Sequence, residues 1–156
     1  DNEAADLAAS LFRGNSDTTL INGILLAPNN ECIRMNGSGA TPATLTPRSV
    51  VLSCNATKFL GTGSYNATQV SGFFAAGTNN RDAFTPTFSS LFVNGSNETG
   101  LVAFNATSLG AFFTAVTHIG AVKDSADTWY AGWTCNSSAA SFGTGNSGAC
   151  TSLPIL

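Results

Sequence analysis

The amino-acid sequence predicts a mainly β domain stapled by disulfides, with a short β-solenoid-like or β-sandwich-like fold and two or three short helices. Short apolar segments recur along the chain, and Gly, Pro and Asn residues separate them. Four cysteines can link such segments covalently. No uninterrupted apolar run is longer than residues 24–27, which is the length of a strand and far short of a membrane span. At 156 residues the chain fits one domain, which we expect to cover residues 1–156.

The predicted strands are apolar segments that end at turn-forming residues. One strand, interrupted at Asn22-Gly23, is expected over residues 18–26. The others are expected at residues 32–35, 44–46, 49–53, 58–60, 119–122 and 128–134.

Apolar residues at helical spacing predict three short helices. Residues 3–12 are rich in Ala and carry Leu7 and Leu11 four positions apart. Residues 67–76 and 108–116 each place a Phe-Phe pair and further apolar residues on one helical face.

The charge balance excludes several classes of partner. Only 10% of residues are charged and the formal net charge is −3, so neither nucleic acid nor an anionic membrane should attract the chain. The 43% of hydrophobic residues provide enough apolar area for a folded core. A surface of uncharged polar groups suits a protein that is glycosylated, packed into an assembly, or both.

The four cysteines permit three pairings, of which the local one, Cys32–Cys54 with Cys135–Cys150, is the simplest. Each bridge would then close a short loop and stabilise the fold by about 3 kcal/mol. A zinc site is the alternative, but the sequence has no Cys-x-x-Cys and a single histidine. The chain begins with Asp1, not Met, which fits a processed chain or an incomplete reading. We therefore expect an oxidised protein outside the cell or at its surface.

Seven Asn-x-Ser/Thr triplets are candidate glycosylation sites. Several lie beside Gly or in expected turns, where an acceptor would be exposed. Turn chemistry in an Asn- and Thr-rich chain explains the same residues, and both interpretations stay open. The candidates are Asn36, Asn55, Asn66, Asn94, Asn97, Asn105 and Asn136.

The sequence offers little that could carry catalysis, and we expect no catalytic residue, metal or cofactor. His118 is the only histidine and lacks a Gly-x-Ser-x-Gly or His-Glu companion, so we expect a structural role for it. Asp124 and Asp127 form the most site-like pair because three aromatic residues follow them closely. We expect these carboxylates to bond local backbone amides in a turn. The aromatic residues would either cap the β core or form a carbohydrate-binding platform; they are Trp129, Tyr130 and Trp133.

The C-terminal third resembles a known group of proteins. Residues 119–124 (IGAVKD) followed by residues 127–135 (DTWYAGWTC) are similar to the end of secreted bacterial surface proteins with a parallel β-helix, which finish in an "IGA…W…GWT" block. Residues 22–26, 32–34 and 49–54 are similar to the final coils of such a helix. The resemblance implies export, surface exposure and a fold made of terminal coils with a cap. It brings no catalytic residues.

Together these features predict a structural subunit of an extracellular fibre or surface assembly, polymerising with copies of itself through β edges and terminal segments. Residues 1–18 are expected to dock on a neighbour, and residues 119–156 to form a cap and tail. A cell-surface carbohydrate-binding or adhesion module is the alternative. An enzyme acting on polysaccharides is a third interpretation.

Overall fold

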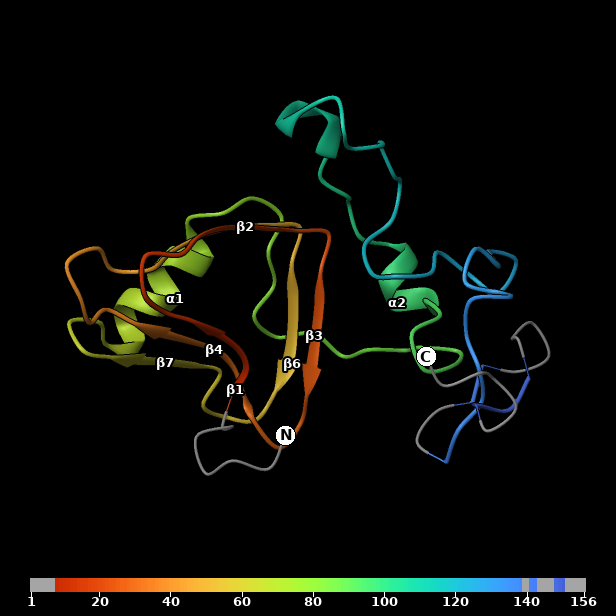
Figure 1. Cartoon of the computed structure of the whole chain (residues 1–156), viewed down its shortest axis with the longest axis horizontal. Helices are drawn as coiled ribbons and strands as arrows, with labels where there is room; N and C mark the ends of the chain where they lie inside the picture. The colour runs from red at the N-terminus through yellow and green to blue at the C-terminus, as the bar shows by residue number, and fades with distance from the viewer. Residues whose placement is uncertain (1–7, 139–140, 143–147, 151–156) are drawn as a thin grey trace.

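The computed structural model describes residues 8–138, 141–142 and 148–150, and in this part the chain is mainly β (Figure 1). Seven strands lie in its N-terminal half. They are β1 (Ala8–Phe12), β2 (Asp17–Ile21), β3 (Ile24–Ala27), β4 (Glu31–Asn36), β5 (Thr44–Arg48), β6 (Val51–Cys54) and β7 (Phe59–Thr62).

The strands form three sheets, and every pairing is parallel. The orders are β1-β4-β7, β2-β5 and β3-β6. The chain therefore passes the same three sides in turn and lays each pass against the one before. We call residues 8–27 the first layer, residues 31–54 the second layer and residues 59–83 the third layer.

A helix replaces the middle strand in the third layer. After β7, α1 (Ala67–Ala75) contacts β7 and β5. Asn66 caps it: its side chain accepts from the Gln69 amide while the Gln69 side chain accepts from the Asn66 amide. Val70 and Phe74 are its buried residues, so the helix covers the end of the core.

The core is centred on the second layer. Almost all of its large members come from β4, β5, β6 and α1, and no residue of the first layer is fully buried. The main cluster consists of Cys32, Ile33, Met35, Ala43, Leu45, Val50, Leu52, Val70 and Phe74. A layer thus reaches full burial only where another layer lies on each side of it.

Both expected disulfides are present. Cys32–Cys54 joins the start of β4 to the end of β6, with Cα atoms 5.5 Å apart, and so closes the second layer. Cys135–Cys150, with Cα atoms 4.9 Å apart, links two parts of the C-terminal region. The local pairing is confirmed, and no described cysteine is free.

The C-terminal segment, residues 84–138, is mostly turns around α2 (Ser96–Thr99) and the short 3-10 helix η1 (Ala106–Leu109). It lies beside β3 and β6, on the side away from α1 (Figure 1). A second apolar cluster fastens it there: Val51, Leu101 and Ile119, with Ile24 and Phe84 packed against them. Across the described residues no helix is long and apolar enough to cross a membrane.

Four expectations about secondary structure are wrong. In the helix predicted over residues 3–12, residues 8–12 form β1, because pairing with β4 overrides the helical preference of Ala and Leu; residues 3–7 lie outside the described part. Residues 108–116 do not form a helix: η1 ends at Leu109, and Gly110 follows with a φ of 153°. The strands predicted at 119–122 and 128–134 are turns, apart from one isolated bridge between Val93 and Val122.

Substitutions at two glycines of the third layer test this packing. Gly72 lies in α1 with open space around its Cα, so Gly72→Ala should stabilise the fold by about 0.5–1 kcal/mol. Gly77 abuts the Pro47 carbonyl and the Asn80 amide, so a Cβ would collide with backbone. Gly77→Ala should cost roughly 1–3 kcal/mol.

Chemical denaturation of the two variants beside the wild type measures both effects. Equal changes in the two variants would contradict this arrangement of the third layer.

Candidate functional site: the open edge of the first layer

In the part of the chain that the structure describes, the outer side of the first layer is an unpaired edge. Within the described residues, β1, β2 and β3 each have a strand neighbour on one side only. Parallel strands direct alternate backbone groups to their two sides, so about half of the N–H and C=O groups in each edge strand have no strand partner. Such an edge can receive a strand from another polypeptide.

The hydrogen bonds between β2 and β5 identify these groups in β2. The Thr44 amide donates to the Ser16 carbonyl at 2.9 Å, and the Asn22 amide donates to the Arg48 carbonyl at 3.0 Å. Even-numbered residues of this stretch therefore face β5. The N–H and C=O groups of Asp17, Thr19 and Ile21 face the open side.

The same reasoning applies to β3. The Val51 amide donates to the Gly23 carbonyl at 3.0 Å, which directs the odd-numbered residues toward β6. The backbone groups of Ile24 and Leu26 consequently face the open side. Two strands of one layer thus present free groups in the same direction.

The side chains at this end are apolar and incompletely covered. Phe12 and Leu25 pair in register with Met35 and Leu52, which are both fully buried. In the first layer the corresponding rings and methyl groups are only half-buried, although they pack on the core. Leu11 and Leu26 are 49% and 47% exposed on the same layer. The open edge therefore combines free backbone groups with apolar surface.

The opposite end of the stack is closed on two of its three sides, and the edge of β7 is the third. Asn80 supplies the bonds that another strand would make: its Nδ2 donates to the carbonyls of Pro47 and Phe74, and its Oδ1 accepts from the Val50 amide. Arg81 pairs with Val51, so the next residue, Asp82, continues the inward row of Leu25 and Leu52. A carboxylate in that place opposes the addition of another apolar layer.

Among the described residues, the C-terminal segment hydrogen-bonds to the first layer at the corner between β2 and β3, beside the apolar contact of Ile24. The Asn22 side chain donates to the Phe104 carbonyl at 3.0 Å and accepts from the Phe104 amide at 2.7 Å. The Asn22 carbonyl accepts from Gly120 at 2.8 Å. Asn22 has a φ of 50°, which Asn tolerates better than most residues. These bonds fix the corner and leave the edges of β2 and β3 without a strand partner among the described residues.

The acidic pair takes part in a local turn. Asp124 Oδ1 accepts from the Ala126 amide at 2.9 Å, and Asp127 Oδ2 accepts from the Lys123 amide at 3.0 Å. Both carboxylates thus bond backbone amides, as expected for a turn. His118 is half-buried nearby in the sequence, and the described residues contain no cluster of three metal-ligating side chains.

The three C-terminal aromatic residues do not form one flat platform. Tyr130 packs edge-on against Phe92 with ring centroids 5.3 Å apart, and the Trp129 and Tyr130 planes meet at 88°. Trp129 is 63% exposed while its Nε1 donates to the Ala121 carbonyl, and Trp133 is 87% exposed. Tyr130 therefore serves as packing, and the two tryptophans lie individually on the surface.

The candidate glycosylation sites differ in exposure. Asn66, Asn97 and Asn105 are exposed, although each side chain takes part in a local hydrogen bond. The half-buried candidates are Asn36, Asn55 and Asn136. Asn94 differs from the other candidates: its side chain is buried, and Nδ2 donates to the Ile119 carbonyl at 2.7 Å.

Sequence reasoning missed Glu98, the fully buried carboxylate of α2. It accepts hydrogen bonds from the Thr87 amide at 2.7 Å, the Thr87 hydroxyl at 2.9 Å and the Gly95 amide at 2.9 Å. Burial alone would raise the pKa of Glu98. The hydrogen bonds together lower that pKa by more than burial raises it, so the pKa of Glu98 lies below its ordinary value. The Asn-Gly-Ser-Asn-Glu run alone gave no sign of this role.

Comparisons with known proteins do not assign this chain to a family. No family model, curated protein or solved structure matches it. The geometry of the edge and of the closed end must therefore carry the functional argument.

Glu98 makes stability depend on pH in a predictable direction. Because its pKa is lower in the folded chain, its contribution is complete above the ordinary value of 4.5 and is lost as pH falls through the folded pKa. Thermal unfolding of the wild type should therefore show a Tm that declines in acid below about pH 4.5.

The matched variant is Glu98→Gln, which should lose about 1–3 kcal/mol near neutral pH because one acceptor becomes a donor. The difference in stability between wild type and variant should shrink in acid. A difference that stays constant with pH would show that the carboxylate charge has no such role.

Proposed function

We propose that this chain is a structural subunit of an extracellular surface assembly and joins it through the open edge of the first layer. One observation carries the proposal: registered positions that are fully buried in the second layer are only half-buried in the first. Adding a layer on the open side would bury this apolar surface and pair the free backbone groups.

The chemistry of the chain supports a place outside the cell. Two disulfides persist where the environment is oxidising. A charged fraction of 10% leaves little electrostatic repulsion between neighbouring copies. Both features suit a subunit that packs closely with others.

The geometry of the closed end favours one form of self-association over another. In a head-to-tail filament, each first layer would stack on the third layer of the next copy. The edge of β7 could accept a strand, but α1 and Asp82 obstruct the other two sides. We therefore favour contact between two open ends, which gives a closed pair of copies as the unit of assembly.

A proline scan at adjacent residues tests this edge. Thr19 directs its N–H to the open side, so Thr19→Pro should remove an assembly donor and leave the β2–β5 ladder intact. We expect Thr19→Pro to sediment as a monomer at concentrations where the wild type forms a larger species, with little change in Tm.

The neighbouring variant Thr18→Pro is the control. The Thr18 N–H faces β5, so the substitution should remove a ladder hydrogen bond and lower stability by about 1–3 kcal/mol. A wild-type chain that stays monomeric at every concentration tested would contradict the proposal. Unchanged association of Thr19→Pro would contradict the assigned edge.

A further inference from the structure

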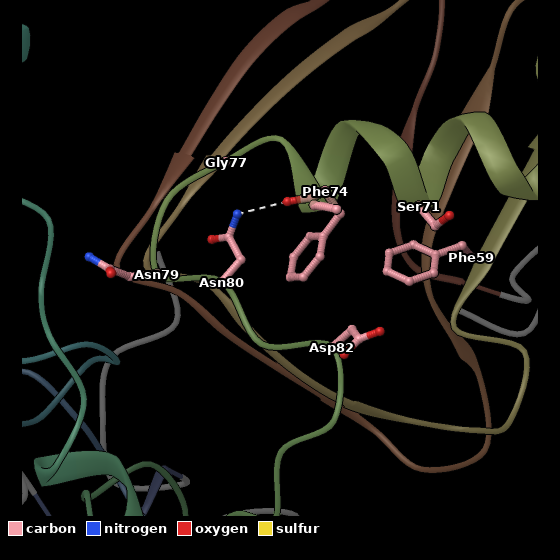
Figure 2. A pocket seen from close by; sticks show the side chains of 8 residues that line it. Phe59, Ser71, Phe74, Gly77, Asn79, Asn80 and Asp82 are labelled. Carbon is pink, nitrogen blue, oxygen red and sulfur yellow. Dashed lines mark hydrogen bonds between the residues drawn. The ribbon is translucent and has the colours of Figure 1, made fainter.

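The closed end of the stack carries a recess that the proposed assembly does not use. It encloses about 400 Å³ between β7, α1 and the loop that follows α1 (Figure 2). A second hollow of about 350 Å³ shares Phe59, Ser71 and Asp82 with it. The combined depression lies at the end opposite the open edge, so both surfaces can be occupied at once.

Aromatic rings form the apolar wall of the recess. Phe59 and Phe74 lie with ring centroids 5.5 Å apart, and their planes are tilted by 49°. Phe74 is buried in the core, whereas Phe59 is only half-buried and borders both hollows. Figure 2 shows the two rings side by side with Asp82 below Phe59.

Some polar groups at the rim already form hydrogen bonds within the protein, and others do not. Asn80 makes three hydrogen bonds to the protein backbone, so its role is structural. The Ser71 hydroxyl donates to the Thr68 carbonyl at 3.0 Å and keeps its acceptor capacity. The side chains of Asn79 and Asp82 are exposed and form no hydrogen bond with the described residues. An unused carboxylate thus faces solvent beside an aromatic ring, whereas the Asn79 side chain points away from the recess (Figure 2).

We propose that this recess binds a neutral saccharide unit. A sugar presents hydroxyl donors to carboxylate and hydroxyl oxygens and an apolar ring face to an aromatic side chain, and the recess offers these partners in Asp82, Ser71 and Phe59. The volume lies near the lower end of the ~300–1,000 Å³ range of small-molecule sites, which suits one or two sugar rings. Asp82 is the charged residue that lines the larger recess, and Lys58 lines the adjoining hollow. The two formal charges offset each other across the combined depression, which suits a neutral ligand.

This site differs from the carbohydrate platform predicted from the sequence. That platform used Trp129, Tyr130 and Trp133, whose rings are not coplanar. The recess instead combines residues from β7, α1 and the following loop, which only folding brings together. Saccharide binding at the recess is independent of the assembly edge and can succeed or fail separately from it.

The experiment is an NMR titration of the full chain with glucose, galactose, mannose, N-acetylglucosamine and cellobiose at millimolar concentrations. Binding should produce saturable shifts of backbone amides at residues 59, 71 and 79–82 with at least one of these sugars. Asp82→Asn and Phe59→Leu should each weaken that binding about tenfold or more. Trp133→Ala should leave it unchanged.

Asp82→Asn alters an exposed side chain, so it tests the site even if Phe59→Leu disturbs the fold. Three results would overturn the proposal: shifts with none of the sugars, shifts centred on Trp129 and Trp133, or stronger binding of tetramethylammonium than of any sugar. The last outcome would identify the recess as a site for an organic cation.

Discussion

The parallel stacking of successive layers is the constraint on which the rest of the structure depends. In such a stack the backbone hydrogen bonds run between layers, so a layer satisfies its N–H and C=O groups only when it has a neighbour on each side. The second layer meets this condition, and it contains most of the fully buried core. The first and third layers each have to deal with one uncovered side, and they do so in different ways.

The third layer ends the stack with specific substitutions. A helix replaces a strand, Asn80 satisfies three backbone groups, and Asp82 introduces a charge where the earlier layers carry leucine. Because a charged side chain cannot fill the place of an apolar one, the same substitutions leave the recess open. Closing the stack and forming a polar, aromatic-walled hollow are therefore two consequences of one local change. The first layer has no comparable device among the described residues.

Much of the N-terminal half could be predicted from the sequence, because its strands are apolar segments bounded by turn residues. Residues 44–46 and 58–60 indicated β5 and β7, and an amphipathic pattern over residues 67–76 indicated α1. The β1 segment could not be predicted in this way, since its Ala and Leu residues prefer a helix and only pairing with β4 makes it a strand. Phe112 shows the opposite failure: it has helical spacing, but its ring meets the neighbouring Phe113 ring instead of a core and it is 93% exposed.

The candidate sites were harder to predict than the strands. The aromatic residues at 129–133 were predicted as a possible site because they are close in sequence. The recess instead unites residues from three separate elements. The residues beside Asp82 in the sequence do not mark it as part of a site. It stands out only because it follows Leu25 and Leu52 in the stack of layers. The direction of each edge amide likewise depends on register, which the sequence does not specify.

Hydrogen exchange at single residues tests the central claim most directly. In dilute solution the amides of Thr18 and Leu20, which face β5, should be protected, and those of Thr19 and Ile21 should exchange rapidly. Raising the protein concentration should slow exchange at Thr19 and Ile21 selectively, as the open edge becomes paired. Exchange at these two residues that stays fast at every concentration would contradict the account.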